Sequence, residues 1–173
     1  KQYHDAVLAL IEHPFDALYF TGFKSLDDAQ CALMGARAVY DGPVLISLVP
    51  NEEGMFSGGR TLSEGVALCD EYGADVIGVV SDAPARVLVG FAKEMASVTD
   101  KPLLVDVSVR RKDRRQFEPT DENPYPTADA MVELVVRLRA QGVQFLRASG
   151  AATPAYTGAL LATVGGSDVV VPQ

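Results

Sequence analysis

The sequence has no tryptophan and only two cysteines among its 173 residues. Cys31 and Cys69 lie far apart, without a CxxC spacing or a pair of nearby histidines. This arrangement argues against a disulfide-stapled scaffold and against a zinc site built from neighbouring residues. It is typical of a reducing compartment, so we expect a cytoplasmic protein. Both cysteines fall in apolar helical patterns, where we expect them to be buried in the core.

Basic residues and long apolar runs are also scarce. The 15 Lys and Arg against 23 Asp and Glu give a net charge of −8, which argues against a nucleic-acid or anionic-membrane partner. No apolar run approaches the roughly 18 residues of a membrane helix, and the start has no signal-peptide pattern. The chain does not begin with methionine, so we expect a piece of a longer protein.

The few basic residues are unevenly placed. Arg110, Arg111, Lys112, Arg114 and Arg115 follow one another closely, directly after a candidate strand. Such a run can hold a phosphate or an acidic partner, and it can equally be a solvated loop. The sequence leaves both interpretations open.

Short apolar runs, by contrast, are abundant, and they alternate with longer amphipathic segments. Each run is almost continuously apolar, which is typical of a strand buried on both faces. The predicted strands are Ala17–Phe20, Pro43–Val49, Asp75–Val80, Pro102–Val107 and Val143–Leu146. One helix is expected before them, over Tyr3–Glu12, and the last helix is expected to stop at Gly165. Helices between and after the strands should begin at Ser25, Thr61, Pro84, Thr127 and Thr153.

Helices strictly between strands predict right-handed crossovers, a parallel sheet and a single domain over residues 1–173. Five βα units can complete an open, doubly wound sheet. They can also form part of an eight-stranded barrel, which requires roughly 250 residues. The pattern leaves both architectures open, and in both the loops at the carboxyl ends of the strands carry the chemistry.

Common catalytic and nucleotide-binding motifs are missing from the sequence. Neither GxxxxGK[ST] nor GxGxxG is present, and we interpret Gly54–Arg60 as a flexible turn. Ser81 and Ser149 stand at strand ends, but both histidines lie on or beside the first helix, which disfavours a Ser–His pair. Asp82 and Asp106 end neighbouring strands and could face one site, although capping or ion pairing is the commoner role.

Three segments together resemble a known family: ADVIGVVSDAP, KPLLVDV and GVQFLRASGAATPAYTGALLATV, in this order. They resemble the homocysteine S-methyltransferase family, which includes the homocysteine-binding domain of cobalamin-dependent methionine synthase and the betaine-dependent enzymes. The resemblance runs from Tyr3 to Val164 and corresponds to the family barrel from its third helix onward. It implies a (β/α)8 TIM barrel to which this chain supplies about five βα units.

In that family, three cysteine thiolates bind zinc, which activates the homocysteine thiol for methyl transfer. The resemblance places these cysteines at Ser81, Ser149 and Gly150, and the glutamate that holds the substrate amino group at Thr21. A neutral hydroxyl is a poor zinc ligand and glycine has no side chain. The resemblance therefore implies a methyltransferase-like scaffold with a degenerate zinc site. We expect no bound zinc or other cofactor.

Two classes of function stay open. One is a methyltransferase-type component that binds a small ligand in the barrel mouth. The other is a non-catalytic binding or structural barrel that docks a partner such as a corrinoid protein. The candidate cavity residues are Thr21, Ser47, Ser81, Asp82, Asp106 and Ser149.

A partial barrel also predicts a partner for its open side. We expect Leu45, Ile77 and Leu104 to face an interior that lacks its opposite wall, beside two unpaired strand edges. An apolar surface of this kind marks an interaction site. We therefore expect the chain to pair with missing N-terminal barrel units or with a second copy of itself.

Overall fold

The computed structural model describes residues 1–112 and 115–168 of the chain. They contain a five-stranded sheet whose neighbours follow the order of the chain, β1-β2-β3-β4-β5, and every pairing is parallel. The strands are β1 (Leu18–Phe23), β2 (Val44–Leu48), β3 (Val76–Ser81), β4 (Leu103–Val109) and β5 (Val143–Gly150). All five predicted strands are therefore present, and β5 extends well beyond its predicted end.

The helices alternate with these strands. They are α1 (Gln2–Leu10), α2 (Leu26–Arg37), α3 (Leu62–Glu71), α4 (Ala85–Ala96), α5 (Val132–Ala140) and α6 (Pro154–Asp168), with short 3₁₀ turns η1 (Ser57–Gly59) and η2 (Asp129–Met131). The Ser25 side chain caps α2, and Thr61 and Glu64 form a reciprocal capping box at α3. Both helices thus begin where the sequence predicts, because the side-chain oxygens satisfy exposed backbone N–H groups.

Two predicted helix limits are wrong. The segment after Thr127 first forms η2, so α5 begins only at Val132. Helix α6 continues through Gly165 to Asp168. A glycine ends a helix when it adopts the left-handed conformation, as Gly73 and Gly142 do with φ of 84° and 85°. Gly165 has no positive φ, so the helix continues.

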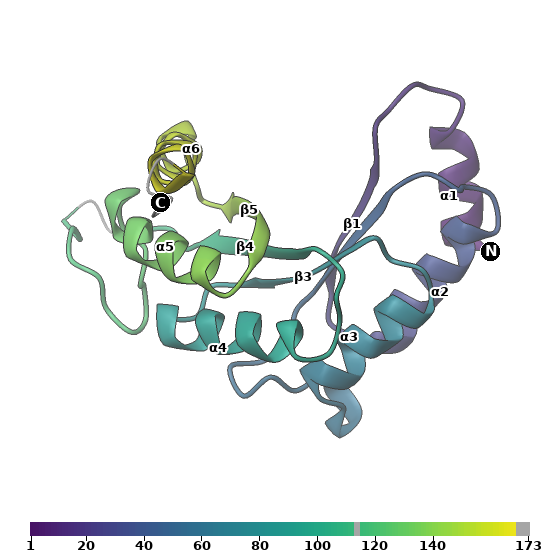
Figure 1. Cartoon of the computed structure of the whole chain (residues 1–173), viewed down its shortest axis with the longest axis horizontal. Helices are drawn as coiled ribbons and strands as arrows, with labels where there is room; N and C mark the ends of the chain where they lie inside the picture. The colour runs from purple at the N-terminus through teal and green to yellow at the C-terminus, as the bar shows by residue number, and fades with distance from the viewer. Residues whose placement is uncertain (113–114, 169–173) are drawn as a thin grey trace.

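The strand order decides between the two predicted architectures. In a doubly wound sheet the strand order reverses at a switch point and helices cover both faces. Here the order is sequential, and Figure 1 shows helices α2 to α5 following one side of a curved sheet. The chain therefore has the fold of a partial (β/α)8 barrel, and the doubly wound alternative is wrong.

Side-chain alternation gives the sheet two different faces. The face toward the helices is mostly apolar and forms the core, with Ile46, Ile77, Val79 and Val105 at 0% exposure. The opposite face, which we call the inner face, carries the residues between them, including Leu45 and Leu104. Ile77 pairs with Ile46 and Leu103 and therefore packs against the helices, so its predicted inward position is wrong.

The cysteines also differ from the prediction. Cys69 is buried in the core on α3, whereas Cys31 is exposed on α2. Helix α2 buries Ala29, Ala32 and Leu33, and Cys31 lies on the turn between them, facing away. Among the helices of the described residues, none has the length and apolar character needed to cross a membrane.

Candidate functional site

The inner face of the sheet carries a row of hydrogen-bonded polar side chains. The Tyr19 hydroxyl lies 2.9 Å from the Ser47 hydroxyl, and Ser47 also donates to Thr21 at 3.0 Å. Ser47 is fully buried, so these bonds satisfy its polar atom inside the protein. Strand register explains the grouping, because Tyr19 pairs with Leu45, and Ser47 lies two residues further along the same face.

A buried ion pair lies on the same face, on strands β4 and β5. Asp106 is 1% exposed, and its Oδ2 accepts a hydrogen bond from Arg147 Nη1 at 2.8 Å. The other carboxylate oxygen, Oδ1, is buried and has no hydrogen-bond partner. The Arg147 side chain is about half exposed, at 48%. The site therefore combines a shielded, half-satisfied anion with a cation that reaches solvent.

Arg147 also connects the two edges of the sheet. Its guanidinium carbon lies 5.6 Å from the centre of the Tyr19 ring, although Tyr19 is on β1 and Arg147 is on β5. In a flat sheet these strands would be roughly 19 Å apart, at about 4.8 Å per strand. Two long side chains pointing inward from a curved sheet can make this contact. The inner face is thus the concave wall of the partial barrel.

The structure places four of the six predicted cavity residues on the inner face. Thr21 and Ser47 bond to one another, Asp106 forms the ion pair, and Ser149 pairs with Ser108 in register next to it. Ser81 differs, because its register partner is Val107, a core residue that faces the helices. Its hydroxyl accepts a hydrogen bond from the Ala83 N–H at 3.1 Å.

Asp82 and Asp106 do not form a shared carboxylate site. Asp82 binds Arg110, whose Nε lies 2.6 Å from Asp82 Oδ2. The hydrogen bond from Arg110 is the main reason why the pKa of Asp82 lies below its ordinary value. Asp106 instead binds Arg147. Each carboxylate has its own cation, so both take the ion-pairing role that the sequence analysis favoured over a shared site.

The positions of the family cysteines do not fit a zinc ion. Ser81 and Ser149 belong to opposite faces of the sheet by register. A side chain at Gly150 would place its Cβ 2.6 Å from the Val109 carbonyl oxygen, at a backbone φ of 67°. Among residues 1–112 and 115–168, no three His, Cys, Asp or Glu side chains are grouped to hold a metal ion.

Sequence reasoning missed two residues of this site. Tyr19 was read as part of an apolar run, and Arg147 lay beyond the predicted end of its strand. A signal for Arg147 was present, since this arginine lies two residues after Phe145 and shares its face of the strand. A charged side chain in such a run requires a partner, and Asp106 in the preceding strand is the residue that provides it.

Comparisons with known proteins support the fold. No protein-family model matches the sequence, and no curated protein sequence matches it. The structure is similar to apo homocysteine methyltransferase MmuM from Escherichia coli, with a TM-score of 0.71 and 16% identity, over 94% of this chain and 56% of that one. At this identity the similarity establishes the barrel fold alone, and this chain spans little more than half of that protein.

Other solved barrels are similar to a lesser degree. Dihydrodipicolinate synthase from Acinetobacter baumannii, complexed with pyruvate, has a TM-score of 0.59 and 14% identity over 94% of this chain and 54% of that one. An archaeal fructose-1,6-bisphosphate aldolase, with its catalytic Lys bound to a carbinolamine intermediate, has a TM-score of 0.52 and 13% identity over 96% and 61%. These enzymes share a fold and differ in chemistry.

Proposed function

We propose that the chain is part of a barrel of the homocysteine S-methyltransferase type that no longer activates a thiol with zinc. Its inner face binds a small ligand with both an amino and a carboxylate group. The observation that carries this proposal is the buried Asp106 carboxylate, half satisfied by Arg147. The resemblance in sequence and the similarity to MmuM support the same class of ligand, an amino acid.

The ion pair offers both charges that an amino acid requires. A buried polar atom without a partner costs about 1–3 kcal/mol, and more when the group is charged. A ligand ammonium group bound to Asp106 Oδ1 would remove this cost. Arg147 uses Nη1 for Asp106, and a guanidinium carries further donors that suit a carboxylate. The hydroxyls of Tyr19, Thr21 and Ser47 lie on the same face and could contact the ligand side chain.

Aldolase chemistry of the Schiff-base kind is less well supported. It requires a lysine amine as the nucleophile within the barrel. The five described strands contain no lysine. Within the described residues, the site favours binding of a charged ligand over formation of a covalent imine.

We also propose that further βα units complete the barrel over the inner face. Within the described residues, strands β1 and β5 each pair on one side only, and Phe145 on β5 is 43% exposed. This chain spans 56% of MmuM, which leaves room for the remaining units. Alternatively, a second copy of the chain could cover the inner face. Docking of a corrinoid-carrying protein has no supporting contact among the described residues.

Calorimetric titration of the purified chain with amino acids tests the ligand. L-Homocysteine or L-methionine should bind, whereas analogues without the amino or the carboxylate group should bind at least about tenfold more weakly, equivalent to about 1.4 kcal/mol each. Asp106→Asn and Arg147→Met should each weaken binding to a similar extent. Arg86→Met, at an exposed position on α4, is the control and should bind normally. Equal binding by the Asp106 variant would contradict the proposal.

Light scattering, which measures the oligomeric state of the chain, tests whether the inner face requires a partner. We expect the chain on its own to associate at micromolar concentration, because β1 and β5 are edge strands of the described sheet and Phe145 on its inner face is exposed. A monomer with a single cooperative unfolding transition would contradict the need for a partner. It would leave the ligand proposal standing, because that depends on the titration.

A further inference from the structure

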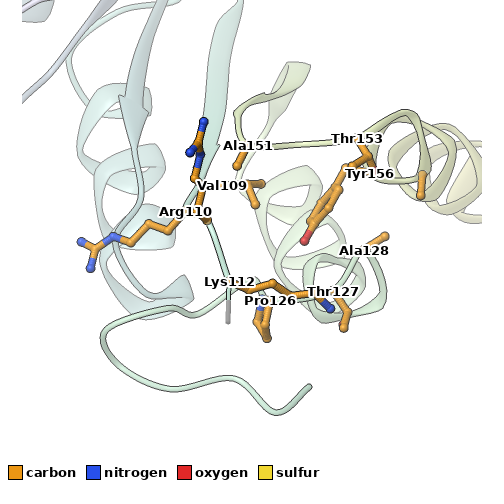
Figure 2. Close-up of a pocket in the computed structure, with 11 residues that line it drawn as sticks. Val109, Arg110, Lys112, Pro126, Thr127, Ala128, Ala151, Thr153 and Tyr156 are labelled. Carbon is orange, nitrogen blue, oxygen red and sulfur yellow. The ribbon is translucent and has the colours of Figure 1, made fainter. Parts of the chain in front are cut away.

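A pocket lies outside the inner-face site, at the carboxyl ends of β4 and β5. Its volume is about 490 Å³. It is bounded by the end of β4, by the segment that precedes η2, and by the start of α6 (Figure 2). The polar residues that line it are Arg110, Arg111, Lys112, Thr127, Thr153 and Tyr156.

The charge of this pocket is opposite to that of the chain. The chain carries a net charge of −8, yet three consecutive cationic residues line the pocket. No Asp or Glu is among the described residues that line it. Arg110 binds Asp82, which offsets part of its charge. Arg111 and Lys112 have no carboxylate partner among the described residues, so the pocket keeps a positive charge.

Lys112 is held without being neutralised. Its amine lies 4.9 Å from the centre of the Phe117 ring, a contact that stabilises a cation and leaves its charge in place. In Figure 2 the Lys112 side chain extends toward Thr127, across the pocket from the β4 strand. Lys112 and Thr127 both line the pocket, so a cation and a hydroxyl are available to the same ligand.

Helix α6 contributes a second source of positive potential. It is a 15-residue helix, and its first residues, with Thr153 before them, line the pocket. Pro154 has no N–H and the Tyr156 N–H bonds to the Thr153 carbonyl at 3.0 Å, so this end contributes mainly through the helix dipole, which is positive here. The Tyr156 hydroxyl donates to the Tyr125 carbonyl at 2.9 Å, which fixes the ring as a wall.

We propose that this pocket binds the phosphate group of a small phosphorylated ligand. A phosphate group carries two negative charges near neutral pH and accepts several hydrogen bonds. It matches a site that combines two unneutralised cations, two threonine hydroxyls and a helix N-terminus. A carboxylate has one charge and would use only part of this set. The pocket therefore adds an anion site to the amphoteric site proposed for the inner face.

The test uses inorganic phosphate and two matched double variants of the chain. Phosphate should bind the parent protein in the millimolar range or better, measured by calorimetry and by ³¹P line broadening. Arg111→Gln with Lys112→Gln should weaken binding at least about tenfold. The control combines Arg86→Gln and Lys93→Gln, which remove the same charge from α4 and should weaken binding less than about twofold. Circular dichroism should show both variants folded.

Three results would overturn the proposal. These are the absence of phosphate binding by the parent protein, equal weakening in both double variants, and binding of an acidic peptide such as polyglutamate without binding of phosphate. Tighter binding of a phosphate monoester than of inorganic phosphate would support a small phosphorylated ligand. Amino-acid binding to the inner face should persist in the Arg111 and Lys112 variant, so failure of either proposal can be recognised separately.

Discussion

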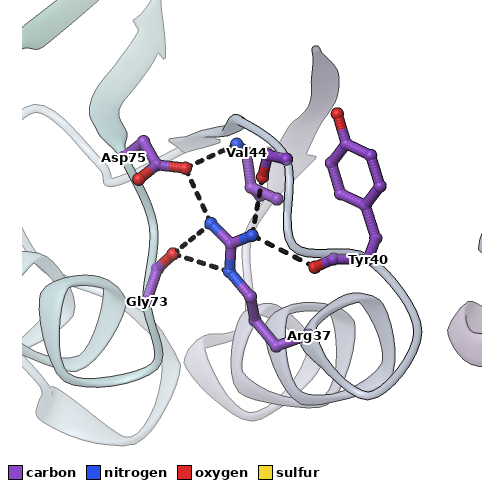
Figure 3. Close-up of polar contacts among 6 residues, drawn as sticks. Arg37, Tyr40, Val44, Gly73 and Asp75 are labelled. Carbon is purple, nitrogen blue, oxygen red and sulfur yellow. Dashed lines mark hydrogen bonds and ion pairs between the residues drawn. The ribbon is translucent and has the colours of Figure 1, made fainter.

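Replacing Arg37 with methionine should lower stability more than any other single surface-charge change in the chain. Arg37 ends α2, and its side chain is 24% exposed (Figure 3). It donates to the carbonyls of Gly73 at 2.9 and 2.6 Å, Gly42 at 2.7 Å and Tyr40 at 3.2 Å. It also donates to Asp75 at 2.7 Å. These bonds join α2 to the segments that lead into β2 and β3.

The contacts of Arg37 determine how much stability the Arg37→Met substitution should remove. Each lost carbonyl bond should cost about 1 kcal/mol, less where water can replace the donor, and the partly exposed ion pair with Asp75 adds about 0.5 kcal/mol. Arg37→Met should therefore reduce the free energy of unfolding by roughly 3 kcal/mol, and lower the melting temperature by about 6–12 °C. Methionine retains most of the apolar stem, so the loss reports the polar contacts.

Urea denaturation would measure the free energy of unfolding of Arg37→Met, with Arg86→Met as the control. The Arg86–Asp121 pair is 3.5 Å long, with side chains 67% and 87% exposed, so its loss should change stability by less than about 0.5 kcal/mol. A change below about 1 kcal/mol for Arg37→Met would refute the reasoning. It would mean that water or another side chain satisfies the three carbonyls without cost.

The stability that the Arg37–Asp75 ion pair contributes should depend on pH, because Asp75 titrates. Burial alone would raise the pKa of Asp75, but hydrogen bonds from the Val44 N–H and from Arg37 bring it below its ordinary value. A lowered folded-state pKa gives stability that is fully present above the unfolded pKa, near about 3.9, and lost as the pH falls through the folded value. The difference in stability between the parent protein and Asp75→Asn should therefore shrink on acidification below about pH 4.

Four further outcomes are expected. A thiol reagent should label Cys31 and spare Cys69 in the folded chain, because burial raises the pKa of the Cys69 thiol to about 12; labelling of both before denaturation would contradict this. Thr61→Ala should cost about 1 kcal/mol in urea denaturation through loss of the capping box. Gly78→Ala should cost more than about 2 kcal/mol, because its Cβ would lie 2.3 Å from the Leu104 carbonyl oxygen. Elemental analysis should find no stoichiometric zinc.

Most strands and helices could be predicted from the sequence, because the patterns that specify them are local. Continuous apolar runs such as Asp75–Val80 identified the strands, and Ser25 and Thr61 marked helix starts. The periodicity of apolar residues could not distinguish a barrel from a doubly wound sheet. It depends on which strands pair, and both architectures use the same local pattern. The resemblance in sequence supplied the correct choice.

The inner-face site could be predicted only in part, because its composition depends on the register of the paired strands. Thr21 was predicted from the family resemblance and Asp106 from its position at a strand end, and both lie on the inner face together with the predicted cavity residue Ser47. Ser81 was assigned to the same cavity, yet one residue of register moves a side chain to the opposite face, and Val80 occupies the inner position. No sequence pattern fixes that register at the end of a strand. Arg147 was missed because its strand was predicted too short.

The same alternation explains how one strand can serve two sites of different charge. On β4, Asp106 and Ser108 point to the inner face, whereas Val107 and Val109 point toward the helices. The chain then leaves the sheet through Arg110, Arg111 and Lys112, which line the pocket beside α6. An anionic group in the inner site and a cationic pocket at the end of the strand can thus coexist, because the sheet separates them. Charge changes on one side should therefore alter ligand binding on that side only, and titration of each variant with both ligands measures this independence directly.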